Sequence, residues 1–123
     1  MGVFNKSESF NNETTVISGT TVFKGNIDSK GNVHIDGIIE GNVNAASNIS
    51  IGKKGRITGE VKCKKMVVSG IFDGKAECDD VEILKNGKLK GEITVLNFVI
   101  EKGGNFEGIC YKKNENSKKH PVK

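Results

Sequence analysis

Three cysteines and two histidines are the residues of this sequence best suited to metal binding or nucleophilic chemistry. Cys63, Cys78 and Cys110 form no Cys-x-x-Cys pair, the spacing that is typical of zinc sites. His34 stands between two apolar residues of an alternating segment, so its side chain should point to solvent, and His120 lies near the C-terminus. Because neither histidine has a second ligand at metal-binding spacing, we predict no metal site and no catalytic histidine.

Phosphate-binding and acid–base motifs are also absent from the sequence. Neither GxGxxG nor GxxxxGK[ST] occurs, so no loop is predicted to cradle a nucleotide or another phosphate. Aspartate and glutamate mostly occupy outward positions of alternating segments, and no acid pair lies in apolar surroundings that would raise a pKa for general acid catalysis. We therefore predict no catalytic residues, no cofactor and no enzymatic activity.

The charge of the 123-residue chain is unevenly distributed. Its net charge is +4, but residues 1–13 sum to −1, residues 14–111 to +1 and residues 112–123 to +4. Because the central part is almost neutral, the basic pI reflects the C-terminal tail and predicts no nucleic-acid partner. We expect residues 1–13 and 112–123 to be disordered flanks of one domain at 14–111.

The sequence also favours a cytoplasmic location. No stretch approaches 18 apolar residues, and no basic region followed by an apolar run opens the chain, so we expect neither a membrane-spanning helix nor a secretory signal. An odd number of cysteines is typical of free cytoplasmic thiols.

A five-residue pattern, apolar–x–Gly–x–apolar or small, occurs six times. The fold of this repeat must determine where the cysteines, histidines and charged residues lie. Its glycines lie 16, 18, 15, 17 and 17 residues apart and are Gly25, Gly41, Gly59, Gly74, Gly91 and Gly108. Each unit contains three short segments of alternating apolar residues, separated by corners rich in glycine, asparagine or lysine. A repeat of 15–18 residues without helical periodicity indicates one triangular coil of a parallel β-helix, giving about six coils over residues 14–111.

Stacking these coils predicts columns of equivalent inward residues about 4.8 Å apart. The columns are Ile17/Ile35/Ile51/Val68/Ile83/Ile100, Phe23/Ile39/Ile57/Phe72/Leu89/Phe106 and Ile27/Val43/Val61/Ala76/Ile93/Cys110. Outward Lys24 should lie beside Glu40. Cys63 and Cys78 should meet in one inward column, where packing by small buried thiols is favoured over a disulfide or a metal site. We expect the corner residues Asn32, Asn48 and Asn97 to use left-handed backbone angles.

The two ends of such a solenoid are its predicted functional surfaces. Each end exposes unpaired strand groups around apolar core, and solenoids normally cover them with a polar cap or an amphipathic helix. Neither flank has an amphipathic helical pattern, so copies should pair through their ends and build filaments. The predicted polymerisation interface consists of Ile17, Phe23, Phe98, Ile100 and Phe106.

The sequence resembles the bactofilins, which are bacterial cytoskeletal polymers. The resemblance covers roughly residues 14–111 and is carried by the run from Ile57 to Lys75, ITGEVKCKKMVVSGIFDGK. It implies a right-handed parallel β-helix, and apolar filaments that form end to end without nucleotide. It also implies roles in cell shape through placement of cell-wall enzymes. The family's membrane-targeting element is similar to the stretch that contains Val3, Phe4 and Lys6.

Three classes of function follow from these observations. The favoured hypothesis is a cytoskeletal scaffold that polymerises at the inner face of the cytoplasmic membrane. Its expected partners are further copies of itself, the membrane surface, and cell-wall hydrolases, synthases or their membrane regulators. A soluble β-solenoid adaptor that does not polymerise is the first alternative. A solenoid enzyme of the acyltransferase or carbonic anhydrase type is the second, although the inward spacing does not fit the hexapeptide repeat of acyltransferases.

Overall fold

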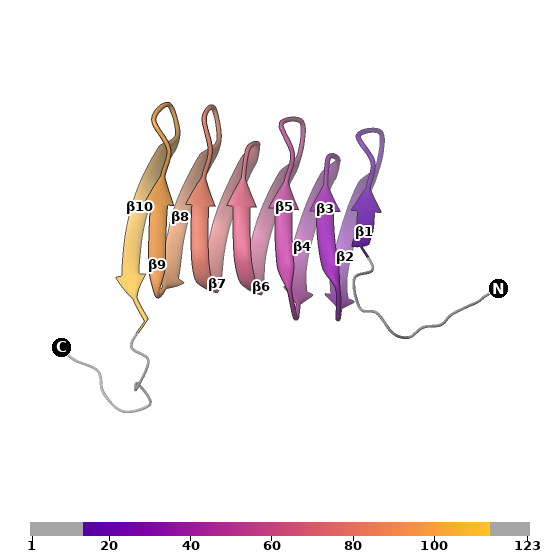
Figure 1. The fold of residues 1–123 in the computed structure, drawn as a ribbon. Coiled ribbons are helices and arrows are strands. Elements are labelled where there is room, and N and C mark those ends of the chain that lie inside the picture. The colour runs from indigo at the N-terminus through magenta and orange to yellow at the C-terminus, as the bar shows by residue number, and fades with distance from the viewer. Residues whose placement is uncertain (1–13, 114–123) are drawn as a thin grey trace.

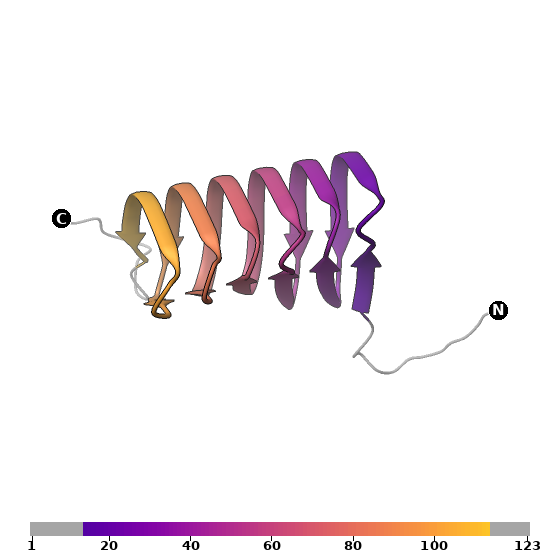
Figure 2. The ribbon, with the colours of Figure 1, turned by 90° about the horizontal axis from the view of Figure 1, so that it is seen from above.

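The computed structural model describes residues 14–113, which form ten β-strands and no helix. All strand pairs are parallel and belong to one continuous sheet, and the chain winds as a β-solenoid of about six turns (Figures 1 and 2). The strands are β1 (Thr14–Ile17), β2 (Val22–Ser29), β3 (Asn32–Ile35), β4 (Ile38–Ala45), β5 (Asn48–Ile51), β6 (Arg56–Val68), β7 (Ile71–Ile83), β8 (Lys88–Val95), β9 (Asn97–Ile100) and β10 (Asn105–Lys112).

Each turn of the solenoid, here called a coil, contains one four-residue and one eight-residue stretch of strand. Coils one, two and six are β1 with β2, β3 with β4, and β9 with β10. Coil three is β5 with the first part of β6, and coil four is the rest of β6 with the first part of β7. Coil five is the rest of β7 with β8. β6 and β7 have 13 residues because they continue through a corner into the next coil.

The repeated glycine bends each eight-residue stretch, so two of the three predicted segments form a single strand. Gly74 has a φ of 144°, a region that L-residues rarely adopt. A Cβ atom there would collide with the carbonyl oxygen of Gly59, its neighbour in the preceding coil. Because both constraints recur from coil two to coil six, this position tolerates glycine alone, which explains its recurrence in the sequence.

The solenoid core has the predicted register. Ile35 pairs with Ile51 and Ile57 with Phe72, and the remaining pairs follow all three predicted inward columns. Side chains at these positions are aliphatic or phenylalanine in the central coils and are almost completely buried. Among the described residues no polar or charged residue is buried, so burial of apolar surface is the main source of stability for the fold.

The prediction for the asparagine corners is wrong. Within residues 14–113, Asn86 is the only non-glycine residue with a positive φ, 72°. Asn32, Asn48 and Asn97 instead begin β3, β5 and β9. The side chains of Asn32 and Asn97 link neighbouring coils, since the backbone N–H of Asn48 donates to Oδ1 of Asn32 at 3.2 Å and Nδ2 of Asn97 donates to Oδ1 of Asp80 at 2.9 Å.

The C-terminal boundary also differs from the prediction of a disordered tail from residue 112. β10 includes Lys112, which pairs with Val95. The backbone N–H of Lys113 donates to the Val95 carbonyl, and its Nζ lies 3.0 Å from Oδ1 of Asp79. The strand ladder between β8 and β10 extends to Lys113 because the Val95 carbonyl at the end of β8 accepts this further hydrogen bond. The other predicted flanking residues, 1–13 and 114–123, lie outside the described part. Within residues 14–113, no helix is long and apolar enough to cross a membrane.

Candidate functional site

The two ends of the solenoid carry open strand edges. Within the described residues, β1 pairs only with β3 and β2 only with β4 at one end, while β9 pairs only with β7 and β10 only with β8 at the other. In this part of the chain each end therefore presents a row of unpaired N–H and C=O groups, which is a template for pairing with another strand. No proline interrupts these edge strands, so they lack a common device that prevents such pairing.

Apolar side chains fill the C-terminal end between β9 and β10. Phe98 and Phe106 pack edge to face, with ring centroids 5.1 Å apart and planes at 76°, an arrangement that aromatic pairs favour. Both are only partly buried. Ile100 is 44% exposed, whereas Ile83, which precedes it in the same column, is fully buried. Phe98 and Phe106 are thus in contact, and Ile100, another residue of the predicted interface, lies in the same strand as Phe98.

The N-terminal end also has partly exposed inward residues, with one phenylalanine in place of two. Ile17 in β1 and Phe23 in β2 pack against the core but remain partly exposed. Their column neighbours in coil two, Ile35 and Ile39, are fully buried. Residues of these two columns are therefore buried where a coil lies on both sides and remain partly exposed where a coil lies on one side only.

Exposed outward-facing apolar side chains also gather at the ends, a feature that the sequence analysis missed. In the described part, every large apolar residue that is exposed belongs to coil one, two or six. Besides Ile100 of the inward column, these are the outward-facing Val16, Val22, Ile38, Val99, Ile109 and Tyr111. The sequence indicates them by apolar residues at outward positions, which are mostly polar in the central coils. Glu82, for example, precedes the 55% exposed Val99 in its column. The apolar surface therefore extends around the rim of both ends.

The sides of the solenoid are charged instead. Lys24 and Glu40 are neighbours as predicted, with 3.9 Å between Nζ and Oε1. Similar pairs join Lys62 to Glu77 at 3.8 Å and Lys65 to Glu82 at 3.7 Å. Such exposed pairs stabilise a fold by about 0–1 kcal/mol each. Their main consequence is a hydrated side surface that contrasts with the apolar ends.

His34 makes two contacts that the sequence analysis did not identify. Its Nδ1 lies 3.3 Å from Oγ of Ser50 in the next coil, and its Nε2 lies 3.1 Å from Oδ2 of Asp36. All three residues are partly exposed, so water competes for these hydrogen bonds. The predicted register would have found Ser50, because Ile35 and Ile51 are stacked and their preceding residues must be stacked too. No group of three or more metal-ligating side chains occurs in the described range 14–113.

A parallel β-solenoid with open, apolar ends and charged sides defines a structural protein of the self-assembling class. The comparison with protein families agrees with this class. The chain belongs to the bactofilin family, whose model, described as polymer-forming cytoskeletal, matches residues 15–111.

Two solved bactofilin structures from Thermus thermophilus share the fold. The first, a cryo-EM reconstruction of double helical filaments, is 25% identical, with a TM-score of 0.77 over 80% of this chain and 99% of that chain. The second, a crystal structure of a phenylalanine-to-arginine mutant, is 24% identical, with a TM-score of 0.69 over 72% of this chain and 99% of that chain. No curated protein matches the chain.

Proposed function

We propose that this bactofilin is a cytoskeletal subunit that polymerises without nucleotide by stacking its solenoid ends. One observation carries the proposal: both ends combine open strand edges with apolar side chains that a further coil would bury. The filament structure of the Thermus thermophilus bactofilin supports it. Phe98, Ile100 and Phe106 form the contact at one end, and Ile17 and Phe23 form the contact at the other.

The driving force is burial of these side chains together with strand pairing across the junction. Full burial of one large apolar side chain contributes about 1.5–3 kcal/mol, and each of these residues is already partly buried. Several must act together to offset the roughly 4–15 kcal/mol lost when two subunits associate. A junction in which the ladder continues would place successive coils about 4.8 Å apart along the whole filament.

The Phe106→Arg substitution tests this interface. Because a buried unpaired charge is strongly unfavourable, the variant should elute as a small species and show no filaments by negative-stain microscopy without nucleotide. Its β-rich circular dichroism spectrum should be unchanged. Asn105→Arg is the matched control, since it adds the same charge at the adjacent exposed residue of β10, and it should form filaments like the wild type. Normal Phe106→Arg filaments would show that this end is not the interface.

The same microscopy separates the two alternative functions. A non-polymerising adaptor predicts monomers or dimers for the wild type at every protein concentration. A solenoid enzyme would need its catalytic groups outside the end faces. The enzyme alternative would be favoured if the Phe106→Arg variant turned over an acyl donor or carbon dioxide and if His34→Ala abolished that activity.

We further propose that filaments lie at the inner face of the cytoplasmic membrane and position cell-wall enzymes there. The proposed membrane contact, Val3, Phe4 and Lys6, lies outside the described residues. Burying two apolar side chains and placing one lysine near anionic lipid binds a single chain weakly. A filament holds many such segments at high effective concentration, so binding should require polymerisation.

Liposome sedimentation tests the membrane proposal with anionic vesicles. Wild-type protein should sediment with the vesicles, whereas Phe4→Ala and Phe106→Arg should both remain largely in the supernatant. If the unassembled Phe106→Arg variant binds as well as the wild type, the avidity argument fails. If Phe4→Ala filaments bind normally, another surface contacts the membrane. A fluorescent fusion should lie along the cell envelope for the wild type and become diffuse for Phe4→Ala.

A further inference from the structure

Two cysteines of neighbouring coils are in contact at the centre of the solenoid. Cys63 in β6 pairs in register with Cys78 in β7, and their Sγ atoms lie 3.4 Å apart. Both are free thiols. They occupy one inward column between Ala45 and Val95, which are themselves buried.

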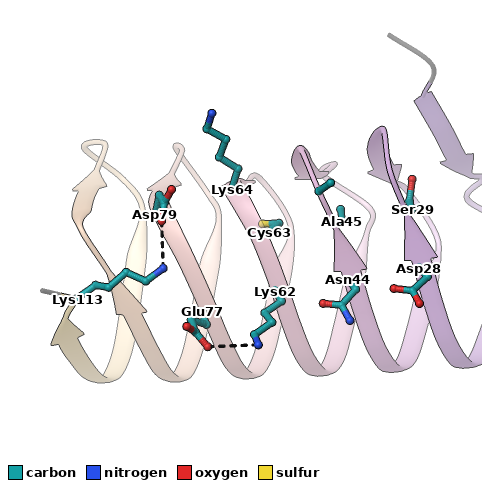
Figure 3. Close-up of a pocket in the computed structure, with 11 residues that line it drawn as sticks. Asp28, Ser29, Asn44, Ala45, Lys62, Cys63, Lys64, Glu77, Asp79 and Lys113 are labelled. Carbon is teal, nitrogen blue, oxygen red and sulfur yellow. Dashed lines mark hydrogen bonds and ion pairs between the residues drawn. The ribbon is translucent and has the colours of Figure 1, made fainter. Parts of the chain in front are cut away.

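The two thiols differ in their access to solvent. Cys78 is completely buried, whereas Cys63 is partly exposed and lines an open groove of about 560 Å³. Around it, Lys62 pairs with Glu77 and Lys113 pairs with Asp79 (Figure 3). A small reagent therefore reaches Cys63 first, and Cys78 lies directly behind it.

The backbone is already placed for a covalent bond between these residues. Neighbouring strands lie about 4.8 Å apart, within the range of roughly 4.4–6.8 Å that disulfides span between Cα atoms. β6 and β7 pair on both sides of the two cysteines, from Arg56 with Ile71 to Val68 with Ile83. The strands are thus fixed in register, and the two sulfur atoms need only a small movement to bond.

We propose that Cys63 and Cys78 form a redox modification site that a peroxide converts to a disulfide joining coils three and four. The Cys63 thiolate attacks one peroxide oxygen, which breaks the O–O bond, releases water after protonation and leaves a sulfenic acid. The Cys78 sulfur then attacks the Cys63 sulfur and displaces a second water. Two thiols and one hydrogen peroxide thus give one disulfide and two water molecules.

This reaction should be slow at neutral pH and faster in alkali. The pKa of the Cys63 thiol is raised well above its ordinary value, first by its hydrogen bond with Cys78 and then by burial. Because the thiolate is the nucleophile, its scarcity limits the first step. The rate should rise about tenfold per pH unit between pH 7 and 9.

The disulfide would join the two halves of the molecule. In a solenoid each coil contacts only its neighbours, so separation of coils three and four divides the structure. A cross-link that closes a loop of about 15 residues restricts the unfolded chain. We expect it to raise the thermal midpoint by roughly 10 °C, and reduction should reverse the change.

Peptide mass spectrometry of the full-length protein tests the proposal. Native protein is treated with hydrogen peroxide, denatured and alkylated. The Cys63 and Cys78 peptides should be linked within one chain and lack two hydrogen atoms, with Cys110 as an exposed internal control. Cys78→Ser should give a sulfenic acid at Cys63 that dimedone traps, and Cys63→Ser should leave Cys78 reduced.

Three results would overturn this assignment. One is complete alkylation of Cys63 and Cys78 under conditions that oxidise Cys110. Another is a linkage between two chains, and the third is a linkage that forms only after denaturation. Because the wild type provides the deciding measurement, the proposal remains testable even if a serine variant does not fold. Filament formation is measured in parallel, and its presence or absence does not affect the result.

Discussion

The central and terminal coils use the same columns of residues for different purposes. Phe72 and Phe106 occupy one inward column, two coils apart. Phe72 has coils on both sides and is completely buried, whereas Phe106 has a coil on one side and is partly exposed. Since the residue type and strand position are the same, only the presence of a second neighbouring coil separates core from surface.

The outward positions strengthen this contrast. In the central coils they carry charged pairs such as Lys62 with Glu77, and in coils one and six they include Val16 and Val99, which are 60% and 55% exposed. A solenoid that remains alone would place polar residues at its ends. The terminal coils instead have a composition suited to contact with another copy, and each of the following predictions tests this difference.

Truncation of the shared phenylalanine should give the largest effect. Phe72→Ala should lower the free energy of unfolding by about 3–5 kcal/mol because it leaves a cavity in a closed core. Phe106→Ala should lower it by about 1 kcal/mol, since less apolar area is lost, but should reduce assembly. Urea denaturation at protein concentrations where the midpoint no longer depends on concentration gives both values.

Phe72→Leu is the control for the central position, since it keeps most of the side-chain volume and should cost less than about 1.5 kcal/mol. Equal losses of stability for Phe72→Ala and Phe106→Ala would mean that the C-terminal end is as closed as the core, and the contrast between the coils would fail.

The repeated glycines allow the same comparison between central and terminal coils at the level of the backbone. Gly74→Ala combines an unfavourable positive φ with a collision against the Gly59 carbonyl, so it should destabilise the fold by about 2–4 kcal/mol. Gly25 has a similar φ of 139°, but it belongs to the first coil that the structure describes, and the nearest described atom to an added Cβ is Cε1 of Phe23 at 3.7 Å. Gly25→Ala should therefore cost only about 1–2 kcal/mol.

Gly25→Ala also measures how closely a second copy packs on the N-terminal end. If strands of another copy continue the ladder at normal spacing, the added methyl group should raise the critical concentration for filaments at least tenfold, about 1.4 kcal/mol. Sedimentation across a concentration series gives this value. Unchanged assembly by folded Gly25→Ala would show that the N-terminal contact leaves room beside β2.

The register of the solenoid was predictable because alternation and glycine spacing act locally in each repeat. Once Ile35 and Ile51 are stacked, every other residue of their coils is fixed as inward or outward. The same reasoning placed Cys63 beside Cys78, and their sulfur atoms are in contact. It also placed Phe98 and Phe106 in the last coil.

Features that depend on side-chain conformation were not predictable in this way. The tolerance of asparagine for left-handed angles predicts corners at Asn32 and Asn48, yet these residues begin β3 and β5, where Oδ1 of Asn32 accepts a hydrogen bond from the Asn48 backbone N–H. The pairing of Lys113 with Asp79 joins residues 34 positions apart, beyond a boundary drawn from composition. The inward columns do not predict the exposed Val16 and Val99, because these apolar residues stand on the outward face.

The last comparison is between a central cysteine and a terminal one in alkali. The pKa of Cys63 is raised by its hydrogen bond with Cys78 and by burial, and that of Cys110 is raised by partial burial, which the nearby charge of Lys112 partly offsets. A raised folded-state pKa means that the unfolded chain loses its proton first, so the related stability is complete below about pH 8.5 and falls as the pH rises. For Cys63 the decline should approach about 1.4 kcal/mol per pH unit. Urea denaturation between pH 8 and 10 should show this slope in the wild type and in Cys110→Ala, and a shallower one in Cys63→Ala. If Cys63→Ala shows the same steep slope, the Cys63 thiol of the wild type ionises as readily in the folded protein as in the unfolded chain.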